Sequence, residues 1–540
     1  TMKIPPRLLI VLSCIATAIS ARAADIMWDV AEGDFLDPAN WAGGVLPGGG
    51  DNAVVSNGGT ATLSDGSITV SQLWAGQSNY GTATGSFIQT GGQLILNAGG
   101  ISGRQAGAVG SWTMTGGSLQ TVDFRVGGGP ATATAPNTSQ GTMSVSGGES
   151  VVTSTGFVGI GTTGTGTLTL SNNALWIHNG GTVFLVGGDN LGSPQAGGTG
   201  TLNVESGAEL VFGGGANLSI GRNTSEAVTT GNGTLNVNGG SITLGGGSLN
   251  LASRQGPTQL AGTGTLNMNS GNITSANGIR MNEGNSTLNF NGGVVTVGSI
   301  QKNATSGTGI VNFNGGTIQA SASSANFIGM AEGTGSGVLT LNVLEGGAIF
   351  DTNGFEITIA HGMSGAGGLT KVGDGTLTLS GANGYAGATV VQAGTLALGA
   401  DDVIADASDL TLNSATLDLA GFSDTMGALA LDGTATINFG LVPGANSLVF
   451  ADSSGATWSG SLVLENFEVG VDTLSFSNGS GLTLSQLDAI QLAGFTVTGL
   501  DANGVVQFSA IPEPSQFAMV MVGGLVVVIA TARRRRRANA

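Results

Sequence analysis

Histidines and closely spaced carboxylates are the residues of this chain best suited to acid–base chemistry. The sequence has two histidines, and one of them, His361, is followed later by the adjacent pair Asp401 and Asp402. The segment LENFEVGVD adds three carboxylates close together, Glu465, Glu468 and Asp472. Two carboxylates that face each other could hydrolyse a glycosidic bond. A basic residue beside a carboxylate could instead abstract a proton in a lyase reaction.

Basic residues that could assist such chemistry occur singly. Outside the two termini they are Arg104, Arg125, Arg222, Arg254, Arg280, Lys302 and Lys371. The segment LENFEVGVD alternates like a strand, so its carboxylates are expected on a solvated edge. We therefore expect no catalytic residues and a protein that is not an enzyme. Because a fold can bring distant carboxylates together, a carbohydrate-active β-helix enzyme, either a polysaccharide lyase or a glycoside hydrolase, is the alternative.

Metal and cofactor sites are not expected either. The single cysteine and the two histidines lie far apart, which does not suit zinc, and GGGDN at 48 and GDG at 373 are single turns rather than repeated calcium motifs. Loose calcium binding to an acidic surface stays open. In ALWIHNGG, Trp176 could stack on a sugar beside His178, but the favoured interpretation is an ordinary strand that is half core and half surface.

The composition is typical of many short strands separated by tight turns. Gly accounts for 98 residues, charged residues for 9% and hydrophobic residues for 40%, and Gly, Ser, Thr and Asn alternate with Leu, Val and Ile. The formal net charge is −18. Without the three basic residues of positions 1–23 and the five arginines and one glutamate of positions 511–540, the body has 7 basic and 32 acidic residues, a net charge of −25. Such a body repels phosphates and other anionic polymers, so nucleic-acid binding is excluded.

One motif recurs along the chain and sets its period. A Gly-Thr or Gly-Ser lead is followed by alternating apolar and polar residues, as in GTLNVNGG at 233 and GTLNMNSG at 264. The first apolar residues of the copies lie 22 to 34 residues apart: Phe87, Trp112, Met143, Leu168, Leu202, Leu235, Leu266, Leu288 and Val311.

A single unit indicates the fold. The segment GTLNVNGGSITLGGGSLNLAS, residues 233–253, holds three alternating runs, which are Leu235/Val237, Ile242/Leu244 and Leu249/Leu251. Alternation places these side chains on one face of each run, and the glycines between runs turn the faces toward a common axis. Three strands per turn of about 20 residues predict an all-β fold, a right-handed parallel β-helix or β-solenoid. The segments between runs are too short for crossover helices, and a flat hairpin meander is the less favoured alternative.

The position after the first strand of each unit carries a short hydrogen-bonding side chain. The residues are Thr90, Thr115, Ser146, Ser171, Asn238, Asn269, Asn291 and Asn314. Turns favour such residues, but stacked along a solenoid they would also form a polar ladder.

The ends of a solenoid need caps, because open strand edges pair with other chains. Residues 24–84, with Trp28, Phe35 and Trp41 at irregular spacing, are expected to form an N-terminal cap and the first coils. Residues 85–399 would be the solenoid repeats, and residues 400–510 the terminal β coils and cap.

The first 23 residues have the layout of a secretory signal peptide. Lys3 and Arg7 precede an apolar run, and Ala21 and Ala23 form a small-x-small site for cleavage before Ala24. Cys14 as a lipoprotein acceptor is the alternative. Without other cysteines, disulfides are not expected to stabilise the fold.

Residues 365–399, GAGGLTKVGDGTLTLSGANGYAGATVVQAGTLALG, resemble the autotransporter-associated β-strand repeat. The resemblance rests on Gly-x-Gly-x-Leu-x-Lys, on Gly-x-Gly-Thr-Leu-x-Leu-Ser-Gly, and on Tyr-x-Gly followed by a closing Gly-Thr-Leu. It implies a parallel β-helix on an exported protein and no particular reaction.

The C-terminal segment, residues 511–540, has three parts in order: Pro512, Glu513 and Pro514, an apolar run at 517–532, and the arginines Arg533, Arg534, Arg535, Arg536 and Arg537. Together these parts resemble the PEP-CTERM sorting signal of Gram-negative bacteria. The resemblance implies recognition by an exosortase and processing near Pro-Glu-Pro. The 16 apolar residues would span about 24 Å as a single helix, less than a hydrocarbon core of about 30 Å, and the arginines would stay in the cytoplasm. A permanent single-span anchor is the alternative.

Together these patterns predict an exported structural or adhesive protein of a Gram-negative cell surface or extracellular matrix, transiently attached to the inner membrane. The expected partners are the Sec translocon, an exosortase, and extracellular polysaccharide or the cell envelope. A permanently membrane-anchored adhesin is the alternative that keeps the C-terminal tail.

Overall fold

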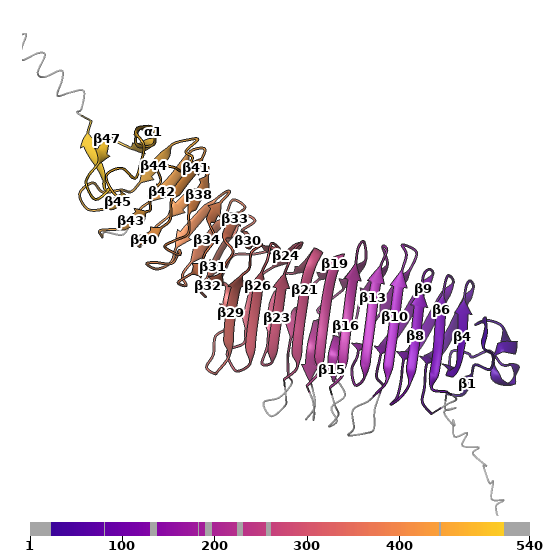
Figure 1. Cartoon of the computed structure of the whole chain (residues 1–540). Coiled ribbons are helices and arrows are strands. Elements are labelled where there is room, and N and C mark those ends of the chain that lie inside the picture. The colour runs from indigo at the N-terminus through magenta and orange to yellow at the C-terminus, as the bar shows by residue number, and fades with distance from the viewer. Residues whose placement is uncertain are drawn as a thin grey trace, which may run out of the picture.

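The protein is a long β-solenoid, seen here in a computed structural model (Figure 1). The structure describes residues 23–79, 82–129, 138–181, 183–189, 197–223, 230–254, 261–441 and 444–511. Strands stack on strands in parallel along almost the whole body. The predicted all-β parallel solenoid is therefore confirmed.

Each coil contributes strands to three stacks, which form the sides of the solenoid. The first stack begins at the N-terminal end and contains the strands of the Gly-Thr motif. Its strands are β2 (Glu32–Asp34), β4 (Asn57–Leu63), β6 (Thr84–Gln89), β8 (Val109–Met114), β10 (Gln140–Ser146), β13 (Thr165–Ser171), β16 (Thr199–Glu205), β19 (Asn232–Leu244), β21 (Thr263–Ser275), β23 (Asn285–Phe290), β26 (Thr308–Phe313), β29 (Val338–Val343), β32 (Met363–Gly365) and β35 (Gly384–Tyr385).

The second stack follows the first around each coil. In coils where one strand turns the corner, its second half belongs here, as in β19 and β21. The stack comprises the first halves of β5 (Ser67–Ala75), β7 (Gln93–Ser102) and β9 (Ser118–Val126), then β11 (Val151–Ser154), β14 (Leu175–His178), β17 (Glu209–Phe212), β24 (Val294–Val297), β27 (Thr317–Ala320), β30 (Ala348–Asp351), β33 (Leu369–Val372), β36 (Thr389–Val391), β38 (Leu410–Asn413) and β41 (Leu429–Asp432).

The third stack closes each coil and takes the second halves of β5, β7 and β9. Its other strands are β1 (Asp25–Met27), β3 (Asn52–Val55), β12 (Val158–Ile160), β15 (Phe184–Asp189), β18 (Leu218–Asn223), β20 (Leu249–Leu251), β22 (Ile279–Met281), β25 (Ile300–Lys302), β28 (Ser324–Met330), β31 (Glu356–Ile359), β34 (Thr376–Leu379), β37 (Thr395–Leu398), β39 (Thr416–Asp418), β42 (Ala435–Asn438), β44 (Leu462–Glu465) and β46 (Ile490–Leu492).

The repeat anchors stack in register as the sequence predicts. Leu202 pairs with Leu235, Leu235 with Leu266, and Leu266 with Leu288. The three runs of residues 233–253 turn their apolar side chains inward, and all six are buried. The first two runs, expected as separate strands, form the single strand β19, which bends through a bulge in its pairing with β21.

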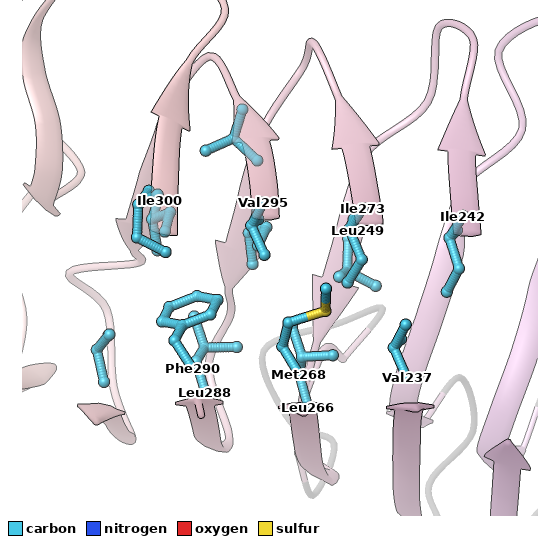
Figure 2. Close-up of a cluster of buried hydrophobic side chains, with 14 of the residues drawn as sticks. Val237, Ile242, Leu249, Leu266, Met268, Ile273, Leu288, Phe290, Val295 and Ile300 are labelled. Carbon is cyan, nitrogen blue, oxygen red and sulfur yellow. The ribbon is translucent and has the colours of Figure 1, made fainter. Parts of the chain in front are cut away.

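The core is a column of like residues packed on like residues. Figure 2 shows Leu266 next to Leu288 and Ile273 next to Val295 on consecutive coils. Because each buried side chain meets its equivalent one coil away, the core is continuous and the burial of apolar area extends along the solenoid.

Glycine leads the repeat motif because one corner of each coil has no room for a side chain. A Cβ at Gly200 would lie 2.2 Å from the carbonyl oxygen of Ile160, and one at Gly233 would lie 2.1 Å from that of Val186. The facing corner residue Gly187 has φ +69, and a Cβ there would lie 1.8 Å from the carbonyl oxygen of Asn232. The Gly-Thr lead thus marks a corner where two backbones touch.

Both ends of the solenoid carry irregular structure. At the N-terminal end, η1 (Pro38–Asn40) and η2 (Ala42–Gly44) bring Trp28, Phe35 and Trp41 into edge-to-face contact over the core. At the C-terminal end, β40 (Asp424–Met426), β43 (Ser447–Phe450) and β45 (Thr473–Phe476) form a separate parallel sheet, and α1 (Leu484–Asp488) precedes the antiparallel hairpin β47 (Phe495–Leu500) and β48 (Val506–Ala510).

Among the described residues, no helix has the length and apolar character needed to cross a membrane. The predicted hydrophobic helix of residues 511–540 lies, apart from Ile511, outside the described residues, as does the predicted signal peptide up to residue 22.

Candidate binding face

The histidine and aspartates that could have formed a catalytic group are each held by the backbone. Nε2 of His361 lies 2.7 Å from the carbonyl oxygen of Leu339. Oδ1 of Asp401 accepts the backbone N–H of Ser423 at 2.8 Å, and the N–H of Asp402 donates to the carbonyl oxygen of Ser423. Within the described chain, no hydrogen bond joins the histidine to either aspartate.

The carboxylates of LENFEVGVD do not converge on a common point. Asp472 accepts the backbone N–H groups of Asn446 at 3.1 Å and of Glu468 at 2.7 Å, and so closes a turn. The side chains of Glu465 and Glu468 are exposed, as the strand-edge interpretation predicts. No cluster of three or more His, Cys, Asp or Glu side chains suited to a metal occurs in the part of the chain that the structure describes.

The described part of the chain has two lysines, and the first of them, Lys302, is buried and joins neighbouring turns. Nζ of Lys302 donates to the carbonyl oxygens of Asn282 at 2.5 Å, Asn303 at 3.0 Å and Ser306 at 2.6 Å. Burial lowers the pKa of Lys302 to about 8, opposed by the negative charge of Glu283. The amine is fully occupied with backbone oxygens and stands inside the solenoid wall.

The other lysine repeats this arrangement in a later coil. Nζ of Lys371 donates to the carbonyl oxygens of Gly373 at 2.7 Å and Ala393 at 3.0 Å, and to Oγ1 of Thr352 at 3.1 Å. Burial lowers its pKa to about 8 as well, although Asp351 and other carboxylates nearby favour the charged form. Both lysines therefore tie successive coils together.

Two arginines lie over aromatic rings at the N-terminal half of the third stack. The guanidinium carbon of Arg104 lies 3.6 Å from the ring centroid of Trp74, and that of Arg125 lies 4.9 Å from the ring centroid of Phe157. Together with Asp123 they line a recess of about 130 Å³. Such cation–π contacts stabilise the packing of long side chains on the solenoid wall.

The sugar-stacking alternative for Trp176 is wrong, and the strand alternates between buried and partly buried residues as the favoured interpretation predicts. Trp176 and His178 are both 0% exposed, because both side chains point into the core. Nε1 of Trp176 donates to Oγ of Ser154 at 2.9 Å, and that hydroxyl also bonds Nδ1 of His178 at 2.9 Å. An indole held in this way has no face open to a ligand.

The predicted polar ladder forms on the first stack for its four asparagines, whereas among the described residues no hydrogen bond links the side chains of Thr90, Thr115, Ser146 and Ser171 to one another. Nδ2 of Asn269 donates to Oδ1 of Asn238 at 2.8 Å, Asn291 donates to Asn269 at 2.9 Å, and Asn314 donates to Asn291 at 3.3 Å. Glu205 extends the ladder by accepting from Asn238 at 2.9 Å. Each amide thus bonds to its neighbours across the coils, as in stacked strands of identical side chains.

A second asparagine ladder runs beside the first and escaped the sequence analysis. It starts at Thr169, and each following amide donates to the oxygen of the preceding coil at 2.7 to 3.2 Å: Asn203, Asn236, Asn267, Asn289, Asn312 and Asn342. The signal was present in the recurring TLNVN and TLNFN segments, whose first Asn lies between two buried residues and therefore points outward.

A column of hydroxyls completes this surface. Ile310, two residues before Asn312, interrupts the column with an apolar side chain. Two residues before the other members of the second ladder, the outward position carries Thr167, Thr201, Thr234, Thr265, Thr287 and Thr340, and Thr142 occupies the same column in β10. These side chains are partly or fully exposed, and their hydroxyls form no hydrogen bond within the described chain. We call the outward residues of strands β10, β13, β16, β19, β21, β23, β26 and β29 in the first stack the Thr–Asn face.

The predicted targeting residues fall at the edges of the described structure. Pro512, Glu513, Pro514 and the arginines 533–537 lie outside the described residues, as does Ala21. Ala23 and Ala24 are described, and the carbonyl oxygen of Ala24 accepts the N–H of Asn52 at 2.8 Å in the first coil. The predicted cleavage would therefore leave this backbone contact with the folded body.

Comparison with known proteins identifies one segment. Residues 369–398 match a family model described as a passenger-associated transport repeat. The match runs from β33 to β37 and confirms the repeat predicted at residues 365–399. A repeat of this kind implies an exported surface protein of the passenger type in a Gram-negative bacterium. No curated protein and no solved structure matches the chain.

Proposed function

We propose that this protein is a non-enzymatic rod that is exported through the Sec translocon, sorted by an exosortase and retained at the cell surface or in the extracellular polysaccharide matrix. The passenger-type repeat at residues 369–398 carries this proposal, because it links the solenoid to exported proteins. The rod would keep neighbouring surfaces apart, coat them or adhere to them, and it would catalyse no reaction.

The chemistry of the described side chains supports a non-catalytic role. The two lysines are occupied as staples between coils, and Asp472 closes a turn. A general base needs a side chain within reach of a substrate proton, which buried amines bonded to carbonyl oxygens do not offer. The exposed surface is instead long, regular and polar on the first stack.

Surface exposure of the native protein tests the proposal. Intact host cells would be treated with a protease that does not enter the envelope, and the protein followed by immunoblotting, with a periplasmic protein as the control for envelope integrity. We expect the protein to be digested while the control survives. Protection equal to that of the periplasmic control would refute surface location, and release of reducing sugars or unsaturated products from polysaccharides by the purified chain would refute the non-enzymatic role.

A further inference from the structure

We infer that the Thr–Asn face binds a neutral, hydroxyl-rich polysaccharide laid across several coils. The inference rests on the proposed adhesive role and assigns to it a surface and a ligand class. Three properties of the face lead to it, namely its open hydrogen-bonding capacity, its lack of charge and its length.

The ladders leave a regular set of donors and acceptors directed outward. An asparagine amide has two N–H donors and two oxygen lone pairs, and within the second ladder Asn267 donates once to Asn236 and accepts once from Asn289. In β16, β19, β21 and β23 each coil therefore keeps a donor and an acceptor for a ligand, next to a threonine hydroxyl that can do both. Because the ladder already fixes the orientation of each amide, a ligand orders little that is not ordered beforehand.

The face is almost free of charge on a strongly acidic body. Among the outward positions of β10 to β29 in the first stack, all of which the structure describes, Glu205 is the one ionisable residue. The body as a whole has a net charge of −25, so an anionic polymer is repelled and a cationic one is attracted to other surfaces. A neutral polymer experiences neither force, and its hydroxyls can form hydrogen bonds with the hydroxyls and amides of the face.

The dimensions of the face suit a long polymer better than a small sugar. Neighbouring parallel strands lie about 4.8 Å apart and outward side chains on one strand lie roughly 6.6 Å apart, so hydroxyls and amides form a two-dimensional array from β10 to β23. Farther along, Ile310 and Val338 place apolar side chains at outward positions. The outward positions of β10 to β29 carry no aromatic side chain, and stacking on single sugars therefore contributes nothing here. Binding depends on many weak contacts made at once, which multivalency makes effective.

The test measures retention of the full chain, held in solution with a mild non-ionic detergent, on insoluble polysaccharides. The probes are microcrystalline cellulose and chitin, which are neutral, and calcium alginate beads, which are anionic. A triple variant, Thr201→Val, Thr234→Val and Thr265→Val, removes three adjacent hydroxyls but keeps the shape and strand preference of the side chains. The matched control, Thr358→Val, Thr378→Val and Thr411→Val, changes outward threonines of the third and second stacks.

We expect retention of the unaltered chain on a neutral probe, insensitive to salt because no charge pair is involved. The triple variant should bind at least about tenfold more weakly, since several hydrogen bonds are lost together. The control should bind like the unaltered chain. Circular dichroism and thermal unfolding verify that both variants fold.

Four results would overturn the inference. They are failure to bind either neutral probe, stronger retention on alginate, equal binding by the folded triple variant, or self-association of the free chain that the triple variant abolishes, which would make a second copy the occupant. Surface exposure is measured independently in whole cells. If the protein is exposed on cells but does not bind the neutral probes, the inferred ligand class is wrong and the proposed surface location remains supported.

Discussion

At the scale of single residues, the wall of the solenoid depends on buried polar groups that hold turns in place. Lys302 and Lys371 each donate to carbonyl oxygens of more than one coil, and Asp424 accepts two backbone N–H groups, from Val403 and Ile404. Buried groups of this kind stabilise only while their partners remain, which makes each of them a sensitive position.

Replacing Lys371 by methionine should destabilise the coil that it joins. The carbonyl oxygens of Gly373 and Ala393 would lose a donor inside the wall, at a cost of about 1–3 kcal/mol for each buried group left unsatisfied. Amide hydrogen exchange of β33 and β36 measures the loss. Arg280→Met, at an exposed outward position of β22, is the control. Equal exchange rates in the two variants would contradict the claim that Lys371 stabilises the coils that it joins.

Asp424 should make the C-terminal coils less stable as the pH rises from about 4 to 7. Burial raises the pKa of Asp424 to about 7, against the lowering effect of hydrogen bonds from backbone N–H groups, and its Oδ1 has no hydrogen-bond partner in the described structure. The folded state therefore holds a proton that the unfolded state releases near the ordinary aspartate pKa of 3.8. Its stabilising effect is complete below that value and is lost as the pH passes 7.

The variant Asp424→Asn removes this titration. We expect it to slow amide exchange of β40 and β43 at pH 7.5, by an amount on the order of 1–3 kcal/mol, and to behave like the unaltered chain near pH 4 once the intrinsic pH dependence of exchange is corrected. Asp406→Asn, an exposed carboxyl of the same coil region, is the control. If amide exchange in Asp424→Asn had the same pH dependence as in the unaltered chain, ionisation of the Asp424 carboxyl would not destabilise these coils.

At the scale of elements, the glycine corner decides whether coils can stack. Gly200→Ala would place a Cβ 2.2 Å from the carbonyl oxygen of Ile160, and overpacking of this kind typically costs about 1–3 kcal/mol. Because repeat proteins can unfold in parts, hydrogen exchange of β12, β13 and β16 is the appropriate measurement. Gly215→Ala, where a Cβ would meet nothing within 4 Å, should have no effect. Equal exchange rates in both variants would contradict the claim that the corner at Gly200 has no room for a side chain.

The asparagine ladder should contribute measurably to the same stack. Asn267→Ala removes the bonds to Asn236 and from Asn289, each with a net value of roughly 1 kcal/mol. We expect faster exchange in β19, β21 and β23, and no change for Asn179→Ala at an exposed turn. Exchange rates in Asn267→Ala equal to those of the unaltered chain would mean that the ladder does not stabilise the fold.

The repeat motif predicts these elements well because its period is strong. The anchors from Met143 to Val311 stack in the expected register, and the ladder at Asn238 to Asn314 is confirmed. The second ladder was missed because its members look like ordinary outward residues until the coils are aligned. The burial of Lys371 and His178 was missed too, although each lies two residues after a buried residue, Leu369 and Trp176, and so points inward.

At the scale of the whole molecule, the solenoid divides by the length of its first-stack strands. The Thr–Asn face runs from β10 to β29, after which this strand shortens to the three residues of β32 and the two of β35, and Figure 1 shows the axis changing direction near this point. The passenger-type repeat, residues 369–398, lies in the part that follows. Composition and period could not place this boundary, because it depends on which residues face out rather than on how many are apolar.

The central claim, an exported rod delivered by a C-terminal sorting signal, is tested most directly by mass spectrometry of the C-terminal peptide. The protein would be recovered from the envelope and culture-medium fractions of its native host. The account predicts a terminus near Pro512–Pro514 with Arg533–Arg537 removed. An intact arginine tail confined to the inner-membrane fraction would contradict it and leave a permanently anchored protein.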